Sequence, residues 1–373
     1  VVASGRGSTD ASVDYTLKVD AAGLSPDSRY YYRFTAGDNT SPVGRTRTLP
    51  TGSVAAVSFA VVSCSNYPAG YFNVYREIVA EDVDAVLHLG DYLYEYAPGG
   101  YASDRAEEFG RVVQPANEIV SLQDYRTRYS QYRSDGDLQA VHAAHPFILV
   151  WDDHEVTNDA WREGAENHQP ETEGDYEERK RAAIQAWYEW LPVRPPSMDD
   201  DAIIYRRFEY GDLVDLIMLD TRIIGRDEQY VLNDFATDGI LDVDAARAAL
   251  NDSGRTLLGA TQRDWLDQQL INATAHWQVL GQQVLLSRYP LPAKILESLD
   301  PGIGGDFNEG VAALLASVAA KQKAPEDRTP EEQALLDSAI PYNPDAWDGY
   351  GFERDALLDQ AGQLGRRLIT LAG

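Results

Sequence analysis

The sequence of 373 residues has almost no cysteine and no long apolar run. Its single cysteine, Cys64, excludes an intramolecular disulfide framework, so stability must come from a packed core and from any bound metal. No apolar stretch approaches the roughly 20 residues that span a bilayer, and the first residues show no charged leader with a hydrophobic segment. We therefore expect a soluble protein with no transmembrane segment, whose printed start is compatible with trimming of a longer precursor.

Positive charge is also scarce. The 32 lysines and arginines stand against 60 aspartates and glutamates, which gives a formal net charge of −28. Such a charge repels nucleic acid and anionic membranes, so we expect no nucleic-acid surface. Composition leaves two explanations open, a solvated acidic shell or carboxylates gathered around hard cations. Apolar residues make up 44% of the chain, which is ordinary globular usage and predicts a normal core.

Residues 1–50 have the pattern of short β-strands separated by turn residues. The expected strands are Tyr15–Asp20, Tyr30–Phe34 and Gly44–Thr48. The segment Leu24–Tyr30 has the spacing of a tyrosine corner, in which a tyrosine at a strand start hydrogen-bonds to the backbone upstream. We expect residues 1–53 to form part of an N-terminal β-sandwich of immunoglobulin-like or fibronectin-like type that begins before Val1.

The pattern changes after the turn at Pro50–Ser53. Apolar runs now alternate with helical segments, which predicts a layered α/β domain over residues 54–373. The expected strands are Val57–Ser63, Ala85–Leu89, Phe147–Trp151, Leu213–Leu219, Trp277–Leu286 and Leu368–Leu371. The expected helices are Glu178–Trp190, Ala245–Leu250, Thr261–Ile271 and Ala312–Gln322, and Asp199–Asp201 is expected to be a solvated loop.

Polar residues follow several of these apolar runs. Ligand sites of open α/β sheets gather beyond the carboxyl ends of the strands, so these residues are expected at one edge. They are Cys64, Asp91, Asp152–Glu155, Asp220–Arg222 and Gln282–Gln283.

Each of these motifs has an ordinary structural explanation when taken alone. Asp91 after Gly90 fits a capped turn, Asp152–Glu155 fits a solvated acidic turn with a structural histidine, and Cys64 fits a small core residue. Together they favour metal binding. Three carboxylates around one imidazole repel one another unless cations compensate, and a thiolate beside carboxylates needs a metal ion. The oxygens of Val156–Asp159 suit calcium.

Five motifs in this order carry a family resemblance. From roughly residue 15 to its end, the chain resembles PhoD-type alkaline phosphatases and phosphodiesterases of the metallophosphoesterase superfamily. The motifs are Ser63-Cys-Ser-Asn66, Gly90-Asp-Tyr-Leu-Tyr-Glu95, Trp151-Asp-Asp-His-Glu-Val-Thr-Asn158, Leu219-Asp-Thr-Arg222 and Trp277-Gln-Val-Leu-Gly-Gln-Gln283.

The resemblance implies an α/β/β/α sandwich core that binds Fe(3+) and Ca(2+). It assigns Cys64, Asp91 and Tyr94 to iron, with Asp91 bridging to the second metal. Asp153 occupies the position where related phosphoesterases carry a bridging asparagine or carboxylate. Asn158 is a calcium candidate, and Glu95 is a looser one.

The chemistry implied is hydrolysis of a phosphate ester by a metal-bound hydroxide that attacks phosphorus. His154 is expected to give a hydrogen bond or proton to the phosphoryl or leaving oxygen. Arg222 is expected to hold the phosphate in a bidentate fork, or else to pair with Asp220. Asn167 and His168 fit either the mouth of the pocket or a helix-capping loop.

The chain departs from the family pattern at one point. Family members carry an Asp-x-His motif directly after a final strand that ends in glycine, and this sequence stops at Leu371-Ala-Gly373. We expect that the printed stretch lacks the last segment of the catalytic domain.

The leading hypothesis is a secreted or periplasmic metal-dependent phosphatase that acts on phosphate monoesters and also on diesters, with export implied by the resemblance. One alternative is a phosphodiesterase or phospholipase D of the same family. Another is a noncatalytic calcium-binding extracellular module, which the acidity and the absent motif favour.

Overall fold

The computed structural model describes residues 1–196 and 202–373, so the loop expected at Asp199–Asp201 lies outside the described part. The chain divides into two compact units. Unit 1 holds residues 1–226, 258–283 and 364–373, and unit 2 holds residues 227–257 and 284–363. Within the described ranges, no helix combines the length and the apolar character needed to cross a bilayer.

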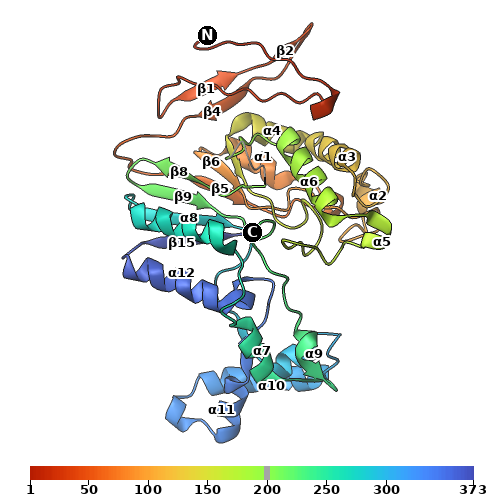
Figure 1. Cartoon of the computed structure of the whole chain (residues 1–373), viewed down its shortest axis with the longest axis vertical. Helices are drawn as coiled ribbons and strands as arrows, with labels where there is room; N and C mark the ends of the chain where they lie inside the picture. The colour runs from red at the N-terminus through yellow and green to blue at the C-terminus, as the bar shows by residue number, and fades with distance from the viewer. Residues whose placement is uncertain (197–201) are drawn as a thin grey trace. The chain divides into compact units, whose positions relative to one another are not determined.

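The N-terminal part of unit 1 contains two small antiparallel sheets. Strand β1 (Arg29–Tyr32) pairs with β4 (Gly44–Arg47), and β2 (Thr35–Ala36) pairs with β3 (Asn39–Thr40) (Figure 1). The tyrosine corner is confirmed, because the Tyr30 hydroxyl accepts a hydrogen bond from the Ser25 N–H at 2.8 Å. The strand expected at 15–20 is wrong, since these described residues are irregular after η1 (Ala11–Val13). Two pairs of strands are present, and the larger sandwich stays a prediction.

A three-stranded parallel sheet follows. It is ordered β5-β6-β7, with β5 at Phe59–Val62, β6 at Ala85–His88 and β7 at Phe147–Leu149. Helices α1 and α4 pack on each other, as do α3 and α6. The helices of this half are η2 (Tyr67–Ala69), α1 (Asn73–Ala80), α2 (Ala106–Phe109), α3 (Leu122–Arg133), α4 (Gly136–Ala144), α5 (Pro170–Glu173) and α6 (Tyr176–Trp190).

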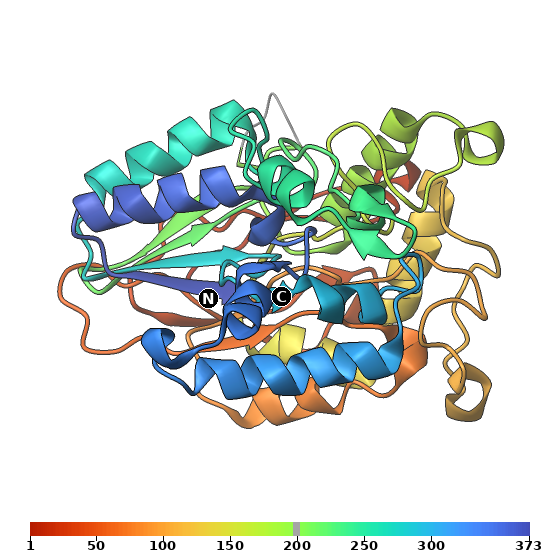
Figure 2. The ribbon, with the colours of Figure 1, turned by 90° about the horizontal axis from the view of Figure 1, so that it is seen from below.

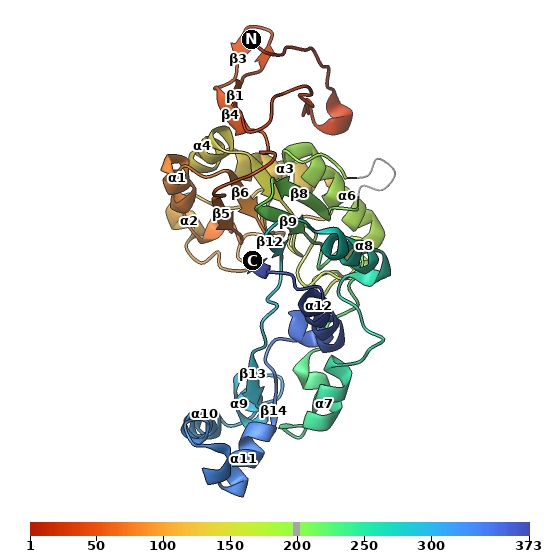
Figure 3. The same ribbon diagram turned by 90° about the vertical axis from the view of Figure 1, so that its left-hand side faces the viewer.

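The second large sheet has four strands in the order β15-β12-β9-β8. Strands β9 (Val214–Met218), β12 (Trp277–Gln282) and β15 (Leu368–Ala372) are parallel, and β8 (Arg206–Tyr210) is antiparallel to β9. Figure 2 shows these strands side by side in green to blue, with α8 (Gly259–Asn272) in teal alongside. In Figure 3, α1 and α4 lie beside the first sheet and α8 beside the second, on opposite sides of the pair.

One apolar core joins the two sheets. Val86 and Leu87 of β6 and Leu216 and Met218 of β9 are completely buried in the same cluster, to which Val279 of β12 also belongs. Burial of both sheets explains why these strands read as continuous apolar runs in the sequence. The sheets therefore form the two inner layers of unit 1, with helices outside.

The six apolar strands predicted for residues 54–373 are all present, although β12 ends at Gln282 rather than Leu286. Strand β8 was missed because its sequence, Arg-Arg-Phe-Glu-Tyr, alternates charged and aromatic residues at a sheet edge. Helix α3 was missed for a similar reason. Its buried face consists of Tyr125, Tyr129, Tyr132 and two arginines, which do not read as an apolar stripe.

Unit 2 has its own small core, formed by Leu232, Leu241, Ala246, Ala293, Leu296, Ile303 and Ile340. A buried ion pair between Arg354 and Asp348 lies in the same unit. Its strands are β10 (Ala236–Thr237), β11 (Ile240–Leu241), β13 (Pro290–Pro292) and β14 (Ala339–Pro341). Its helices are η3 (Leu232–Phe235), α7 (Val243–Leu250), α9 (Ala293–Leu299), α10 (Phe307–Lys321), η4 (Pro325–Asp327), α11 (Pro330–Asp337), η5 (Trp347–Tyr350) and α12 (Gly351–Gln363).

Gln283, directly after β12, connects strand ends of both large sheets. Its Nε2 donates to the Trp151 carbonyl at 2.7 Å and to the Leu219 carbonyl at 3.0 Å. Its Oε1 accepts from the N–H and the hydroxyl of Thr221 at 2.9 and 2.6 Å. The sequence predicts this glutamine among the polar residues at the carboxyl edge of the sheet. In the structure it fixes the backbone that follows β7 and β9.

We predict that Gln283→Ala lowers the free energy of unfolding by about 3 kcal/mol or more, because it leaves buried polar groups without partners. Gln268→Ala, at an exposed position on α8, should change it by less than about 0.5 kcal/mol. Urea unfolding followed by circular dichroism measures both. Equal effects of the two substitutions would contradict the role of Gln283.

Candidate metal centre

The candidate site lies where the backbone leaves β6 and β7. Gly90 follows β6 with φ +113°, a conformation that side chains other than glycine rarely adopt. A Cβ at this position would lie 2.4 Å from Cβ of Asp152, the residue that begins the acidic motif after β7. Glycine is therefore required for the two strand ends to come together.

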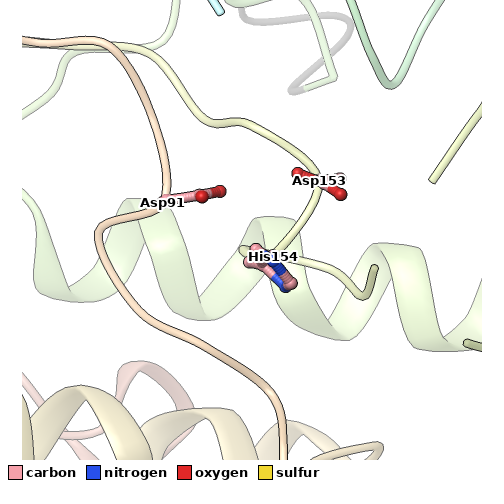
Figure 4. Close-up of side chains that lie close together, drawn as sticks. All are labelled: Asp91, Asp153 and His154. Atoms are coloured by element: carbon pink, nitrogen blue, oxygen red, sulfur yellow. The ribbon is translucent and has the colours of Figure 1, made fainter. Parts of the chain in front are cut away.

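Asp91, Asp153 and His154 form the centre of the site. One ligand atom from each lies within 4.8 Å of the others. All three residues are buried, with exposed fractions of 7%, 5% and 8%. Figure 4 shows the Asp91 carboxylate pointing from its own loop toward Asp153 and His154 on the neighbouring loop. The two carboxylates at this spacing offer oxygen ligands that suit a divalent or trivalent cation, and the imidazole lies beside them.

The backbone around the centre is strained at three non-glycine residues. Cys64, Asp91 and Asp159 have φ of 57°, 55° and 52°, in the left-handed region. Backbone hydrogen bonds support the first two, because Cys64 N–H donates to the Gly90 carbonyl at 3.2 Å and Ser65 N–H to the Asp91 carbonyl at 2.7 Å. Strain of this kind is typical of functional sites, where the surrounding structure enforces it.

Cys64 and Tyr94 lie beside Asp91, and their assignment to one metal position stays a prediction. The Tyr94 hydroxyl donates to Asp91 Oδ2 at 2.8 Å. Burial, followed by the charge of Asp91, raises the pKa of Tyr94 and raises the pKa of the Cys64 thiol to about 11. Solvent still reaches Cys64, which is exposed. Without a cation, both groups stay protonated, and a cation at this position would favour their anionic forms.

The other Asp91 oxygen provides the test of metal fit. Among the described residues, Asp91 Oδ1 is buried and accepts no hydrogen bond. Burial, with the charges of Asp152 and Asp153, raises the pKa of Asp91 well above its usual value. A buried carboxylate oxygen without a donor is unusual, and a cation would satisfy it. The residues therefore fit a bound metal.

Glu155 holds the two loops in place. Its carboxylate accepts three backbone hydrogen bonds, from Asp91 N–H at 3.0 Å, Tyr92 N–H at 2.5 Å and Asp152 N–H at 2.7 Å. Its exposed fraction is 2%. Burial raises the pKa of Glu155 to about 8, although these N–H groups oppose the shift. One side chain thus fixes the start of both ligand-bearing segments.

Glu95 orients His154. Its Oε2 lies 2.7 Å from Nδ1 of His154, while its Oε1 accepts from Asn158 N–H at 2.8 Å and from Asn167 Nδ2 at 2.9 Å. Burial lowers the pKa of His154, but Asp153, Glu95 and Asp91 outweigh it and raise that pKa to about 11. The carboxylate oxygens of Glu95 are used by these contacts, so it serves to position His154.

Arg222 reaches the acidic motif from the end of β9. Its Nε donates to Asp152 Oδ1 at 2.5 Å, and Nη2 lies 3.8 Å from Asp153 Oδ1. Asp220, the partner in the alternative interpretation, contacts Arg222 through its backbone, because Asp220 Oδ1 accepts the N–H groups of Arg222 and Ile223 at 2.7 and 2.8 Å. Asp220 therefore shapes the turn that directs Arg222 to the site.

Three further candidate residues from the sequence, Asn158, Asn167 and His168, form hydrogen bonds to other parts of the protein. The Asn158 amide donates to Glu166 at 3.1 Å, so its side chain is engaged beside the Asp91, Asp153 and His154 group. His168 Nε2 contacts the Gly174 carbonyl at 3.0 Å, and the Asn167 carbonyl accepts from Thr157 Oγ1 at 2.6 Å. For Asn167 and His168, these contacts favour the structural alternative.

In the sequence, Glu155 counts only as one carboxylate of the acidic motif that favours metal binding, and Glu95 has only a calcium role. The signal for Glu155 was its position three residues after Asp152, where a side chain reaches the backbone N–H groups of its own turn. Nothing in the sequence indicated that it would also accept from the loop after β6.

Two family models match the chain. Residues 59–373 match the PhoD-like phosphatase model, and residues 1–50 match the model of the PhoD-like phosphatase N-terminal domain.

Three known proteins are similar to the chain to different extents. Alkaline phosphatase D of Bacillus subtilis (strain 168) is 41% identical over 298 residues, covering 78% of this chain and 48% of the relative. The chain thus spans about half the length of that relative. The solved structure of PhoD has a TM-score of 0.73 and 33% identity, over 97% of this chain and 60% of that one. A purple acid phosphatase from yellow lupin (Lupinus luteus) seeds has a TM-score of 0.42 and 13% identity, over 71% of this chain and 38% of that one.

We predict that Glu155→Gln weakens metal binding on the order of 10- to 100-fold, because an amide has a single accepting oxygen, its NH2 group would face a backbone N–H, and the loops would separate. Calorimetric titration of metal-free protein with Ca²⁺ measures the affinity. Glu163→Gln, at an exposed position, is the matched control and should leave it unchanged. Unchanged affinity in Glu155→Gln would show that the loops hold without this carboxylate.

Proposed function

The chain belongs to the PhoD-like phosphatase family, and we propose that its metal centre hydrolyses phosphate esters, with monoesters as the main substrate and diesters also accepted. The observation that carries this proposal is the buried group of Asp91, Asp153 and His154, in which one Asp91 oxygen has no hydrogen-bond donor among the residues that the structure describes. Buried carboxylates this close together destabilise the folded state unless a cation binds between them. A phosphate ester is the anionic substrate that such a cation would bind.

The proposed ligands divide into two groups. Cys64, Asp91 and Tyr94 would hold Fe(3+), since a thiolate, a phenolate and a carboxylate together favour a strongly charged transition metal. Asp153 and Asn158 would contribute to a neighbouring Ca(2+) site with oxygen ligands. When bound, the metals would neutralise the phosphoryl oxygens and lower the pKa of a water that attacks phosphorus.

The roles of the surrounding side chains follow from their contacts. His154 is held through Nδ1 by Glu95, which leaves Nε2 to give a proton to the leaving oxygen as the phosphorus–oxygen bond breaks. Arg222 provides positive charge beside Asp152 and Asp153 and would exchange part of that pairing for a phosphoryl oxygen.

The same family membership supports two proposals about the whole protein. Residues 1–53 would belong to an N-terminal domain of β-sandwich type, and residues 54–373 to the catalytic domain. The protein would act in a secreted or periplasmic location, where phosphate esters of the surroundings are accessible.

The deciding experiment measures initial rates with 4-nitrophenyl phosphate and bis(4-nitrophenyl) phosphate, with metal supplied and after treatment with chelator. We expect turnover that the chelator abolishes and that added Fe(3+) with Ca(2+) restores. Faster cleavage of the diester would favour the phosphodiesterase alternative. Metal binding without turnover of either ester would contradict the proposal and favour the calcium-binding module.

We predict that His154→Ala lowers kcat by a factor of about 10² or more, because the leaving oxygen loses its proton donor. The loss should be smaller for 4-nitrophenyl phosphate, whose leaving group needs little protonation, than for ethyl phosphate. His276→Ala, at an exposed histidine, is the control and should keep full activity. Equal losses with both esters would argue against proton donation by His154.

A further inference from the structure

A row of aromatic rings continues from the metal centre toward the surface. The ring centroids of Tyr94 and Tyr96 lie 4.1 and 5.6 Å from that of His154. Tyr101 is stacked on Tyr94 with centroids 6.0 Å apart and an interplanar angle of 20°, and it lies 6.2 Å from Tyr96. We refer to Tyr94, Tyr96 and Tyr101 as the tyrosine shelf.

Local sequence explains how Tyr96 and Tyr101 meet. They are joined by Ala-Pro-Gly-Gly, which reverses the chain. Gly99 has φ +89°, and Gly100 N–H donates to the Ala97 carbonyl at 3.0 Å. A Cβ at Gly100 would lie 2.6 Å from Cβ of Tyr96, so the tight turn depends on glycine.

The shelf is tied to the metal-binding loop. Asn66, two residues after Cys64, donates from Nδ2 to the Tyr101 carbonyl at 3.3 Å. Ser103 Oγ donates to the Gly100 carbonyl at 2.7 Å on the other side of the turn. These contacts hold Tyr101 beside the centre, although its side chain is 62% exposed.

Exposure alone does not distinguish Tyr101, because Tyr31 is exposed to a similar extent, 69%. The distinguishing feature is that Tyr101 is the outer ring of a cluster whose inner rings contact His154. A solvent-exposed ring that packs against the rings around His154 offers a flat apolar surface for a bound molecule.

We propose that the tyrosine shelf binds an aromatic leaving group, so that aryl phosphate esters are favoured over alkyl phosphate esters of similar charge. This inference rests on the proposed function. His154 protonates the leaving oxygen in that scheme, so the group attached to this oxygen would lie near His154, whose ring contacts Tyr94 and Tyr96. The electron-rich ring faces repel the phosphoryl group, whereas they stack with another aromatic ring in an offset arrangement.

The test compares 1-naphthyl phosphate with ethyl phosphate. Tyr101→Ala should lower kcat/KM for 1-naphthyl phosphate about tenfold, since stacking on one aromatic side chain typically has an effect of this order. It should change kcat/KM for ethyl phosphate less than about twofold. Tyr101→Phe keeps the ring and should retain the preference, and Tyr31→Ala controls for loss of an exposed tyrosine.

A binding measurement separates this inference from the proposed function. Calorimetry with 1-naphthylmethylphosphonate and propylphosphonate, which are not hydrolysed, reports affinity without turnover. Weaker binding of only the naphthyl compound by Tyr101→Ala supports the shelf, even if the wild type hydrolyses no ester. Equal effects on both compounds, or on neither, would overturn the shelf while leaving ester hydrolysis by the wild type intact.

Discussion

The site depends on one interaction, the acceptance of three backbone N–H groups by the buried carboxylate of Glu155. These N–H groups belong to the loops after β6 and β7, so one side chain fixes the distance between Asp91 and the acidic motif that contains Asp153. The contact is possible because Gly90 lets the two loops approach within van der Waals distance. Without this clamp, repulsion between the aspartates would separate the loops.

Cationic side chains lie beside several of the carboxylates of the centre. Arg222 pairs with Asp152 and approaches Asp153, and His154 is held by Glu95. Asp91 keeps one oxygen without a donor among the described residues, and its pKa is raised by burial and by its acidic neighbours. A cation bound beside Asp91 would offset the repulsion between this carboxylate and its acidic neighbours. Catalytic sites commonly show this arrangement, since a pre-formed negative pocket binds metal at little reorganisation cost.

Much of the fold was predictable because burial leaves a strong pattern. Strands β6, β9 and β12 are covered on both faces and therefore read as continuous apolar runs. The tyrosine corner at Tyr30 was predictable because it is a local contact between two residues five positions apart. Prediction failed for Tyr15–Asp20, where a strand-like pattern lies in exposed, irregular backbone, and for α3, whose buried face is built from tyrosines and arginines. In these segments tertiary contacts outweigh local preference.

The sequence by itself determined the mixed α/β fold, the family and the set of chemical residues at the strand ends, because parallel strands must deliver their following residues to one edge. The tertiary structure decided what each residue does there. The sequence suggested a place for Gln283 and Glu95 in the reactive site. In the structure, Gln283 instead hydrogen-bonds to backbone carbonyls, and Glu95 hydrogen-bonds to His154 and to a backbone N–H. Glu155 looked like one more carboxylate, yet it joins two loops that are more than 60 residues apart. Such partners are distant in sequence, and hydrogen bonds between them form only once the sheets have packed.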